Sequence, residues 1–237
     1  MRALTSSDFL DLWERGSTLH PLDRGILLLG AGLRGTSYET LADWPLGRRN
    51  EALAELRCRC FGAHVNGWMA CTQCGEKLEL DLDGRSLARG IPETASNRSD
   101  SVLAAGHVFR LPTSRDLAGA AKEADPLSAA IRLLQSCRVG QGESPVWSND
   151  ELEEVGQALS LADPMAEILV TLNCPACGSE CQQSLDMAAF LWEEIEARAK
   201  RLLMEVHALA SAYGWTEREV LSLSEHRRAF YLEMVRQ

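Results

Sequence analysis

Two short stretches of this chain, Cys71-Thr-Gln-Cys74-Gly75 and Cys174-Pro-Ala-Cys177-Gly178, decide how its centre folds. Apolar residues come directly before each of these stretches. A Leu-Asp pair follows each one, eight and nine residues after its second cysteine. A glycine after CxxC permits a positive φ, so the backbone turns back and both sulfur atoms point to one side. The shared pattern therefore predicts a weak internal repeat of strand, turn and strand.

One CxxCG turn supplies two thiolates, whereas a tetrahedral zinc site takes four ligands, with Zn–S distances of about 2.3 Å. We predict that Cys71, Cys74, Cys174 and Cys177 bind one structural Zn2+ in a small zinc-ribbon-like β element. The long intervening segment does not prevent this, because loop-closure entropy grows only logarithmically with length. Two alternatives stay open: unrelated reduced turns, or a redox dithiol. A redox dithiol is disfavoured, because neither CxxC motif lies between a strand and a helix of a βαβ unit, where such a dithiol is expected.

The remaining four of the eight cysteines, Cys58, Cys60, Cys137 and Cys181, have no role that the sequence assigns. Cys60 lies on an apolar stripe and Cys137 borders one, which is typical of buried free thiols. Cys181 follows the second turn closely and could replace one of the four ligands.

Around these turns the hydrophobic pattern predicts a mainly helical α+β protein. Apolar residues at helical spacing mark a helix from about residue 48 to 60, and leucines alternate with acidic residues from 78 to 82, as in a half-buried strand. The segment 83–106 is rich in Gly, Ser, Asn and Pro and is expected to be a long surface loop. We call each CxxCG turn a zinc knuckle. The predicted division of the chain is a helical N-terminal region at 1–62, the first knuckle and strands at 63–111, a helical insert at 112–162, the second knuckle at 163–186 and a helical tail at 187–237.

Composition and motifs limit the function. The net charge of -10 gives no support for nucleic-acid or anionic-membrane binding. The N-terminus lacks the apolar run of a signal peptide, and the apolar stretch at 25–33 is too short to span a bilayer, so a cytoplasmic location is expected. No P-loop, GxSxG, HExxH or strand-linked GxGxxG motif is present. We therefore expect a non-enzymatic protein without a small-molecule substrate.

The helical tail supplies the candidate partner-binding residues, Trp192, Trp215, Arg227, Arg228 and Tyr231. Amphipathic helices with aromatic residues on their surface often dock on proteins, although simple packing in the core would produce the same pattern. The alternative function is a zinc-ribbon DNA-binding or regulatory protein that uses these helices, with the two arginines facing the duplex. From residue 186 onward seven Lys or Arg stand against nine Asp or Glu, which favours a protein partner.

Several further stretches suggest a family. The chain resembles small proteins encoded with contractile phage tails and phage-tail-like contractile injection systems and, more distantly, myovirus-type baseplate hub assembly proteins. The resemblance implies a structural or assembly role at a baseplate or hub, other baseplate or hub proteins as partners, and no catalytic residue. Whether the chain stays in the finished particle is left open. The matching stretches are His20-Pro-Leu-Asp23, Leu46-Gly-Arg-Arg49, both knuckles, LELDLD at 78–83, Phe109-Arg-Leu-Pro-Thr113, Asp116-Leu117, Phe190-Leu-Trp-Glu-Glu-Ile195, Ala212-Tyr-Gly-Trp-Thr-Glu217 and Arg227-Arg228.

Overall fold

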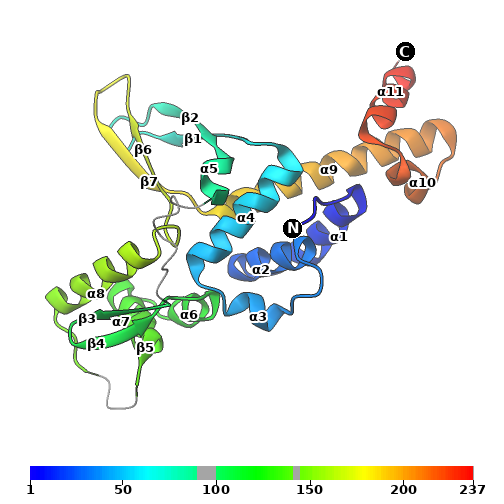
Figure 1. Cartoon of the computed structure of the whole chain (residues 1–237). Coiled ribbons are helices and arrows are strands. Elements are labelled where there is room, and N and C mark those ends of the chain that lie inside the picture. The colour runs from blue at the N-terminus through cyan, green and yellow to red at the C-terminus, as the bar shows by residue number, and fades with distance from the viewer. Residues whose placement is uncertain (90–99, 141–144, 237) are drawn as a thin grey trace.

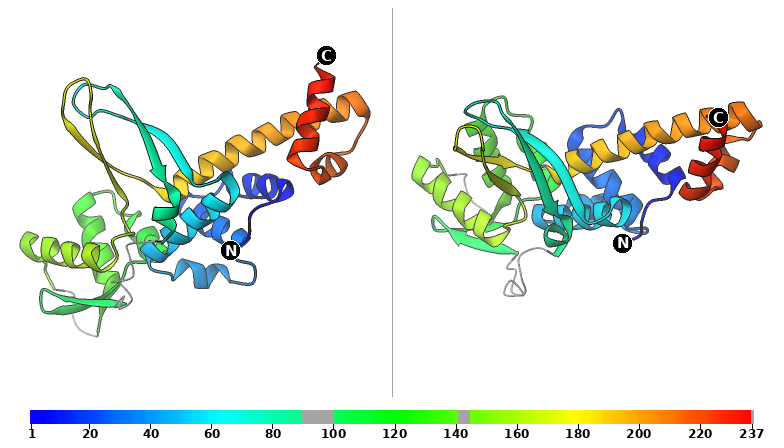
Figure 2. Two further views of the ribbon diagram at one scale, coloured as in Figure 1. Left: turned by 45° about the horizontal axis from the view of Figure 1, so that its top comes forward. Right: turned by 90° about the horizontal axis from the view of Figure 1, so that it is seen from above.

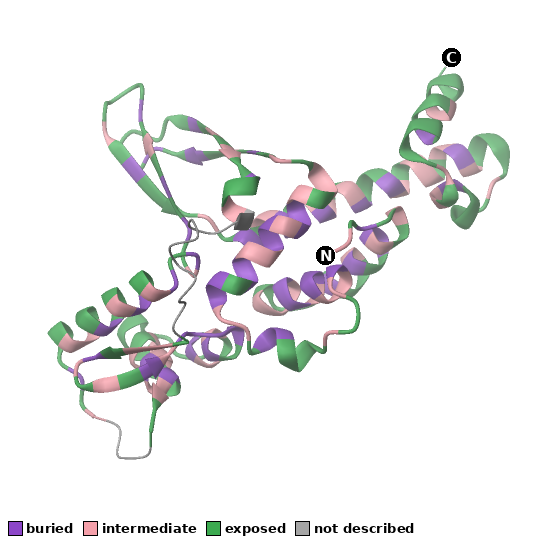
Figure 3. Ribbon diagram, viewed as in Figure 1, coloured by how far each residue is buried: buried purple, intermediate pink, exposed green. Residues whose placement is uncertain are grey.

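The computed structural model describes residues 1–89, 100–140 and 145–236 (Figure 1). The fold is mainly helical α+β, as predicted, and the described residues contain three small antiparallel sheets. Most buried apolar side chains fall into three separate clusters. Figure 3 colours the buried residues purple along the ribbon.

The largest cluster joins the N-terminal helices to the long C-terminal helix. Helices α1 (Ser6–Gly16), α2 (Pro21–Gly32) and α4 (Leu46–Phe61) pack with α9 (Met187–Tyr213), and α3 (Tyr38–Ala42) packs on α2. Their shared core is mostly leucine, and Leu28, Leu53 and Leu191 have no exposed surface. Helix α9 begins at the side chain of Asp186, which accepts hydrogen bonds from two backbone N–H groups. It ends at Gly214, a left-handed residue with φ 71°.

The second cluster lies in the middle of the chain. Strands β3 (Ser101–Ala104), β4 (His107–Arg110) and β5 (Arg138–Val139) form a sheet covered by α7 (Pro126–Cys137) and α8 (Asn149–Ala162). Phe109 is fully buried between them, and α6 (Ser114–Ala120) connects sheet and helices. The boundary expected at residue 111 therefore runs through one hydrophobic core.

The expectation of a long loop at 83–106 is wrong for its described parts. Helix α5 (Gly84–Arg89) starts where Asp83 accepts a hydrogen bond from the N–H of Arg85. Strand β3 pairs with β4 across a turn at Ala105 and Gly106, both of which have positive φ. An Ala-Gly turn lacks the Asn-Gly signal of a two-residue hairpin, so the hairpin of β3 and β4 was not predicted from the sequence. Residues 90–99 lie outside the described residues.

Two β-hairpins carry the cysteine turns. Strands β1 (His64–Ala70) and β2 (Lys77–Asp83) form one, and β6 (Leu169–Asn173) and β7 (Glu180–Ser184) form the other. They lie next to each other with their turns on the same side (Figure 1). Both are separate two-stranded sheets, so only side chains at and below the turns join them.

The C-terminal part of the chain is an arm. Helix α9 extends beyond the helical body and carries α10 (Glu217–Ser222) and α11 (Glu225–Val235) at its far end (Figure 2). Thr216 and Glu219 form a capping box at the start of α10.

The start of α4 joins the helical body to the middle of the chain. Pro45 precedes the helix and offers no side-chain cap. Instead, the carboxylate of Asp163, which follows α8, accepts a hydrogen bond of 2.8 Å from the N–H of Gly47. Nearby, the amide of Asn50 donates to the carbonyl of Met165 at 2.8 Å. A carboxylate is favourable at a helix N-terminus, so this contact stabilises α4 from 116 residues away.

Candidate metal centre

The two cysteine turns have the same backbone geometry. In the first, the N–H of Cys71 donates to the carbonyl of Glu76 at 2.8 Å, and the N–H of Gly75 donates to the carbonyl of Cys71 at 2.9 Å. The second turn repeats both bonds at 2.9 and 2.8 Å. Gly75 and Gly178 have φ values of 77° and 73°. The predicted repeat of strand, turn and strand is therefore confirmed.

Gly178→Ala is expected to destabilise the second hairpin by about 1–2 kcal/mol, because an L-residue pays this penalty at positive φ. No atom lies within 4 Å of the position its Cβ would take, so the backbone conformation alone causes the effect. Gly156→Ala is the control, since Gly156 also has open space but lies in α8. That change should stabilise by up to about 1 kcal/mol. Urea unfolding measures both, and equal effects would contradict the prediction.

The four predicted ligands come together at the ends of the hairpins. All four sulfur atoms lie within 4.8 Å of one another. The Cys71 and Cys177 sulfurs are 3.6 Å apart, and so are those of Cys74 and Cys174. Four sulfurs around an ion at 2.3 Å would be separated by about 3.8 Å, whereas a disulfide needs about 2.05 Å. The donor set thus fits a tetrahedral metal ion, and the cysteines are free thiols.

The hydrogen bonds at the site favour some thiolates and oppose others. Backbone N–H groups of Cys74 and Gln73 lower the pKa of Cys71 to about 6. The hydroxyl and N–H of Ser179 lower the pKa of Cys177. Although the N–H of Glu76 lowers the pKa of Cys74, the thiols of Cys177 and Cys71 raise it to about 12. Four thiolates in this space therefore require a cation among them.

Burial differs between the two cysteines of each turn. Cys71 and Cys174 are buried, whereas Cys74 and Cys177 are exposed. The buried pair rests on a small apolar cluster that includes Met69. The exposed pair leaves one edge of the site open to solvent, which provides an entry path for an ion.

Cys181 lies against this site without belonging to the group of four. The Cys181 thiol donates to the sulfur of Cys71 at 3.4 Å. The hydroxyl of Thr72 donates to the sulfur of Cys181 at 3.9 Å. Cys181 opposes Leu172 in its hairpin, as Leu78 opposes Met69 in the other. The repeat therefore places a cysteine where its first copy has leucine. Comparing the copies position by position would have singled out this residue.

The other cysteines lie elsewhere in the fold. Cys60 is half-buried on α4, where its sulfur accepts a hydrogen bond of 3.4 Å from the N–H of Leu4. Cys58, on the same helix, is also half-buried. Cys137 is fully buried in the second cluster, and burial raises the pKa of its thiol to about 11. These thiols pack as small apolar groups.

Two of the five expected partner-binding residues are buried, so their predicted surface position is wrong. Trp192 is 6% exposed and packs under the guanidinium of Arg24, whose carbon lies 4.5 Å from the ring centre. Arg228 is 1% exposed and bonds to Glu205 at 3.0 Å. Helix α9 packs on the N-terminal helices, and amphipathicity alone did not show which of its side chains they would cover.

The other three expected residues lie at the far end of the arm. Trp215 stacks on Tyr213 with ring centres 4.8 Å apart, and its edge meets Tyr231 at 4.9 Å. The far end of the arm thus carries a cluster of three aromatic rings, and Arg227 is exposed on the same helix as Tyr231.

Comparisons of the chain with protein-family models, curated proteins and solved structures found no match. Among the described residues, no helix combines the length and the apolar character needed to cross a bilayer. The candidate site therefore rests on the geometry and chemistry of its own residues.

Proposed function

We propose that the four-cysteine site binds one structural Zn2+ ion and that the protein is non-enzymatic. The spacing of the four sulfur atoms is the observation that carries this proposal. Zinc accepts four thiolates in a tetrahedron. Catalytic zinc sites keep one coordination position for water or substrate, whereas four cysteines leave none. The ion would clamp two hairpins that share no backbone hydrogen bonds.

We further propose that the protein serves in the assembly or structure of a baseplate or hub in a contractile tail or injection system. The sequence resemblance supports this role, and the C-terminal arm supports docking on other proteins. Exposed Phe230 and Met204 lie on α11 and α9, close in sequence to the cluster of Tyr213, Trp215 and Tyr231. Exposed aromatic and methionine side chains are typical of protein interfaces. The proposed location is the cytoplasm of the producing cell, before or during assembly.

DNA binding by the C-terminal helices is the weaker alternative. Arg228 was expected to face a duplex, but its guanidinium is buried and bonded to Glu205. Only Arg227 of that pair is exposed. The burial of Arg228 therefore removes one of the two arginines on which the proposed duplex contact depended.

Co-expression with hub and baseplate subunits from neighbouring genes tests the assembly role. The wild-type chain should co-purify with a defined subunit at fixed stoichiometry. A Trp215→Ala and Tyr231→Ala double variant should lose that subunit, whereas Trp68→Ala, an exposed tryptophan on the first hairpin, should retain it. Failure of the wild-type chain to bind any of these subunits would refute the assembly role. Salt-sensitive binding to duplex DNA would favour the alternative.

Cys181→Leu is expected to weaken zinc binding by about 10–100-fold, the usual effect of removing a group that orients a metal ligand. Leucine is the residue that the first hairpin carries at this position, so packing should tolerate it. Cys181→Ser keeps a donor to Cys71 and should recover most of the affinity. Competition with a chromophoric chelator measures all three proteins. Equal affinities would show that the thiol only fills space.

A further inference from the structure

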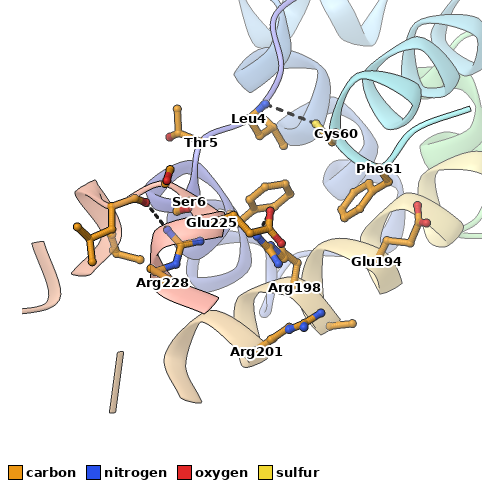
Figure 4. A pocket seen from close by; sticks show the side chains of 15 residues that line it. Leu4, Thr5, Ser6, Cys60, Phe61, Glu194, Arg198, Arg201, Glu225 and Arg228 are labelled. Atoms are coloured by element: carbon orange, nitrogen blue, oxygen red, sulfur yellow. Dashed lines mark hydrogen bonds and ion pairs between the residues drawn. The ribbon is translucent and has the colours of Figure 1, made fainter. Parts of the chain in front are cut away.

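A second site candidate lies away from the cysteines. A cavity of about 650 Å3 opens between the start of α1, the end of α4 and helices α9 to α11 (Figure 4). This volume is typical of small-molecule sites. Its wall combines apolar side chains such as Phe9 and Phe61 with Arg198, Arg201 and Arg228. Three arginines around one cavity stand out in a chain whose net charge is -10.

Arg228 is the deepest of these arginines and has an unused donor. Its Nε donates to Glu205 at 3.0 Å and its Nη1 to the carbonyl of Leu223 at 2.6 Å. Its Nη2 has no hydrogen-bond partner among the described residues, although the side chain is 1% exposed. Figure 4 shows the Arg228 side chain on the same side of the lining as Ser6. A buried donor without an acceptor is unfavourable, so a ligand oxygen that reached this nitrogen would relieve that cost.

The carboxylates at the cavity are already paired or can move. Glu194 is held by Arg57 with two bonds of 3.0 and 2.7 Å. Glu225 pairs with Arg198 at 2.9 Å, but its side chain is 68% exposed whereas that of Arg198 is 16% exposed. Glu225 is the exposed partner of this pair, so its carboxylate can turn into solvent and release Arg198 to another anion.

A third carboxylate is shared. Glu205 accepts from Arg228 at 3.0 Å and lies 3.5 Å from Arg201, so one negative charge serves two guanidinium groups. Once Glu225 turns away, the cavity has an excess of positive charge at its wall. This excess of positive charge favours the binding of an anion.

Two helices also begin at this cavity. Helices α1 and α11 have 11 residues each, and the hydroxyl-bearing residues Thr5, Ser6 and Ser224 at their starts line the wall. The first N–H groups of a helix have no acceptor within it, and the helix dipole adds positive potential there. Such starts bind phosphate and other anions.

We propose that this cavity binds the phosphate group of a small molecule, with Arg228 and Arg198 as its guanidinium donors. Two arginines and the starts of two helices lie at its wall, and a tetrahedral oxyanion accepts hydrogen bonds from several directions at once. The apolar wall around Phe9 and Phe61 would contact the body of the molecule. This inference is independent of the metal site, which lies in the hairpins.

Titration with inorganic phosphate tests the proposal, followed by thermal unfolding and by chemical shifts of the arginine side chains. Phosphate should shift the arginine resonances to a saturating value, and the unfolding temperature should keep rising with the logarithm of its concentration. Acetate and chloride at matched ionic strength should produce neither effect. Arg198→Gln keeps the aliphatic stem and should lower the apparent phosphate affinity at least about tenfold. Arg227→Gln is the matched control, because this neighbouring arginine is exposed and does not line the cavity.

Arg228→Lys adds a second readout, since it keeps the charge but removes the free Nη2. Circular dichroism first establishes that each variant is folded. Weaker phosphate binding in Arg198→Gln and Arg228→Lys, with unchanged binding in Arg227→Gln, would support the site. A response that acetate or chloride reproduces, or that persists at full strength in Arg198→Gln, would overturn it.

Discussion

Replacing Cys174 with serine is expected to abolish stoichiometric metal binding and to unfold the two hairpins. Cys174 is buried and its sulfur lies 3.6 Å from that of Cys74, across the gap between the hairpins. A structural zinc ion contributes on the order of 10 kcal/mol in small zinc domains, and a serine hydroxyl is a poor replacement for a thiolate ligand. The loss should therefore exceed that of any other single substitution proposed above.

The damage should stay local. The helical core of α1–α4 and α9 is a separate cluster from the one beneath the cysteines, so far-UV circular dichroism should remain helical. The hairpin segments 64–83 and 169–184 should become sensitive to protease. Elemental analysis should show about one zinc ion per wild-type chain and much less in the variant. Cys58→Ser is the control, because Cys58 is half-buried on α4 and should keep full metal content.

Metal-free wild-type protein, purified without chelators, would refute the zinc proposal whatever the variants do. Removal of the ion by a chelator should reproduce the behaviour of Cys174→Ser. Zinc binding should also weaken as the pH falls, because ligand thiols must lose their protons to bind. Full zinc retention by Cys174→Ser would instead indicate that another thiol, such as that of Cys181, takes its place.

Gly47→Ala is expected to destabilise the protein by at least about 3 kcal/mol, at the upper end of what overpacking costs. The new Cβ would lie 2.6 Å from the Cγ of Asp163 and closer still to its Oδ1, so the carboxylate must move. Moving it breaks the hydrogen bond to the N–H of Gly47, which caps α4. Steric strain and loss of the cap therefore act together.

Two variants separate these causes. Gly30→Ala is the control, because in α2 the added Cβ would meet only Leu41, at 3.9 Å. It should leave stability unchanged or raise it by up to about 1 kcal/mol. Asp163→Ala removes the carboxylate that would clash with the new Cβ and that also caps α4. Adding Gly47→Ala to this variant should therefore lower the free energy of unfolding little further. Thermal and urea unfolding measure this cycle, and additive effects would show that the two residues do not interact.

Local chemistry explains which features could be predicted from sequence. A CxxCG turn needs only a positive φ at its glycine, so both knuckles could be located without knowledge of the rest of the chain. The apolar spacing around Leu53 likewise follows from the period of one helix. The turn at Ala105 and Gly106 was missed because its residues are not those that normally mark such a turn.

Contacts between distant segments could not be predicted in this way. The side chains that cover Trp192 belong to helices far away in the sequence, and so does the carboxylate that caps α4. The burial of Arg228 depends on how α11 folds back against α9. Each of these contacts depends on the relative placement of whole elements.

The two cysteine turns and the mainly helical surroundings follow from residues that are close together in the chain, so their spacing was enough to predict them. The meeting of the four sulfur atoms, the position of Cys181 beside Cys71 and the place of Arg228 in the wall of a cavity do not follow from such spacing. These features depend on packing between segments up to 110 residues apart, which spacing along the chain does not encode.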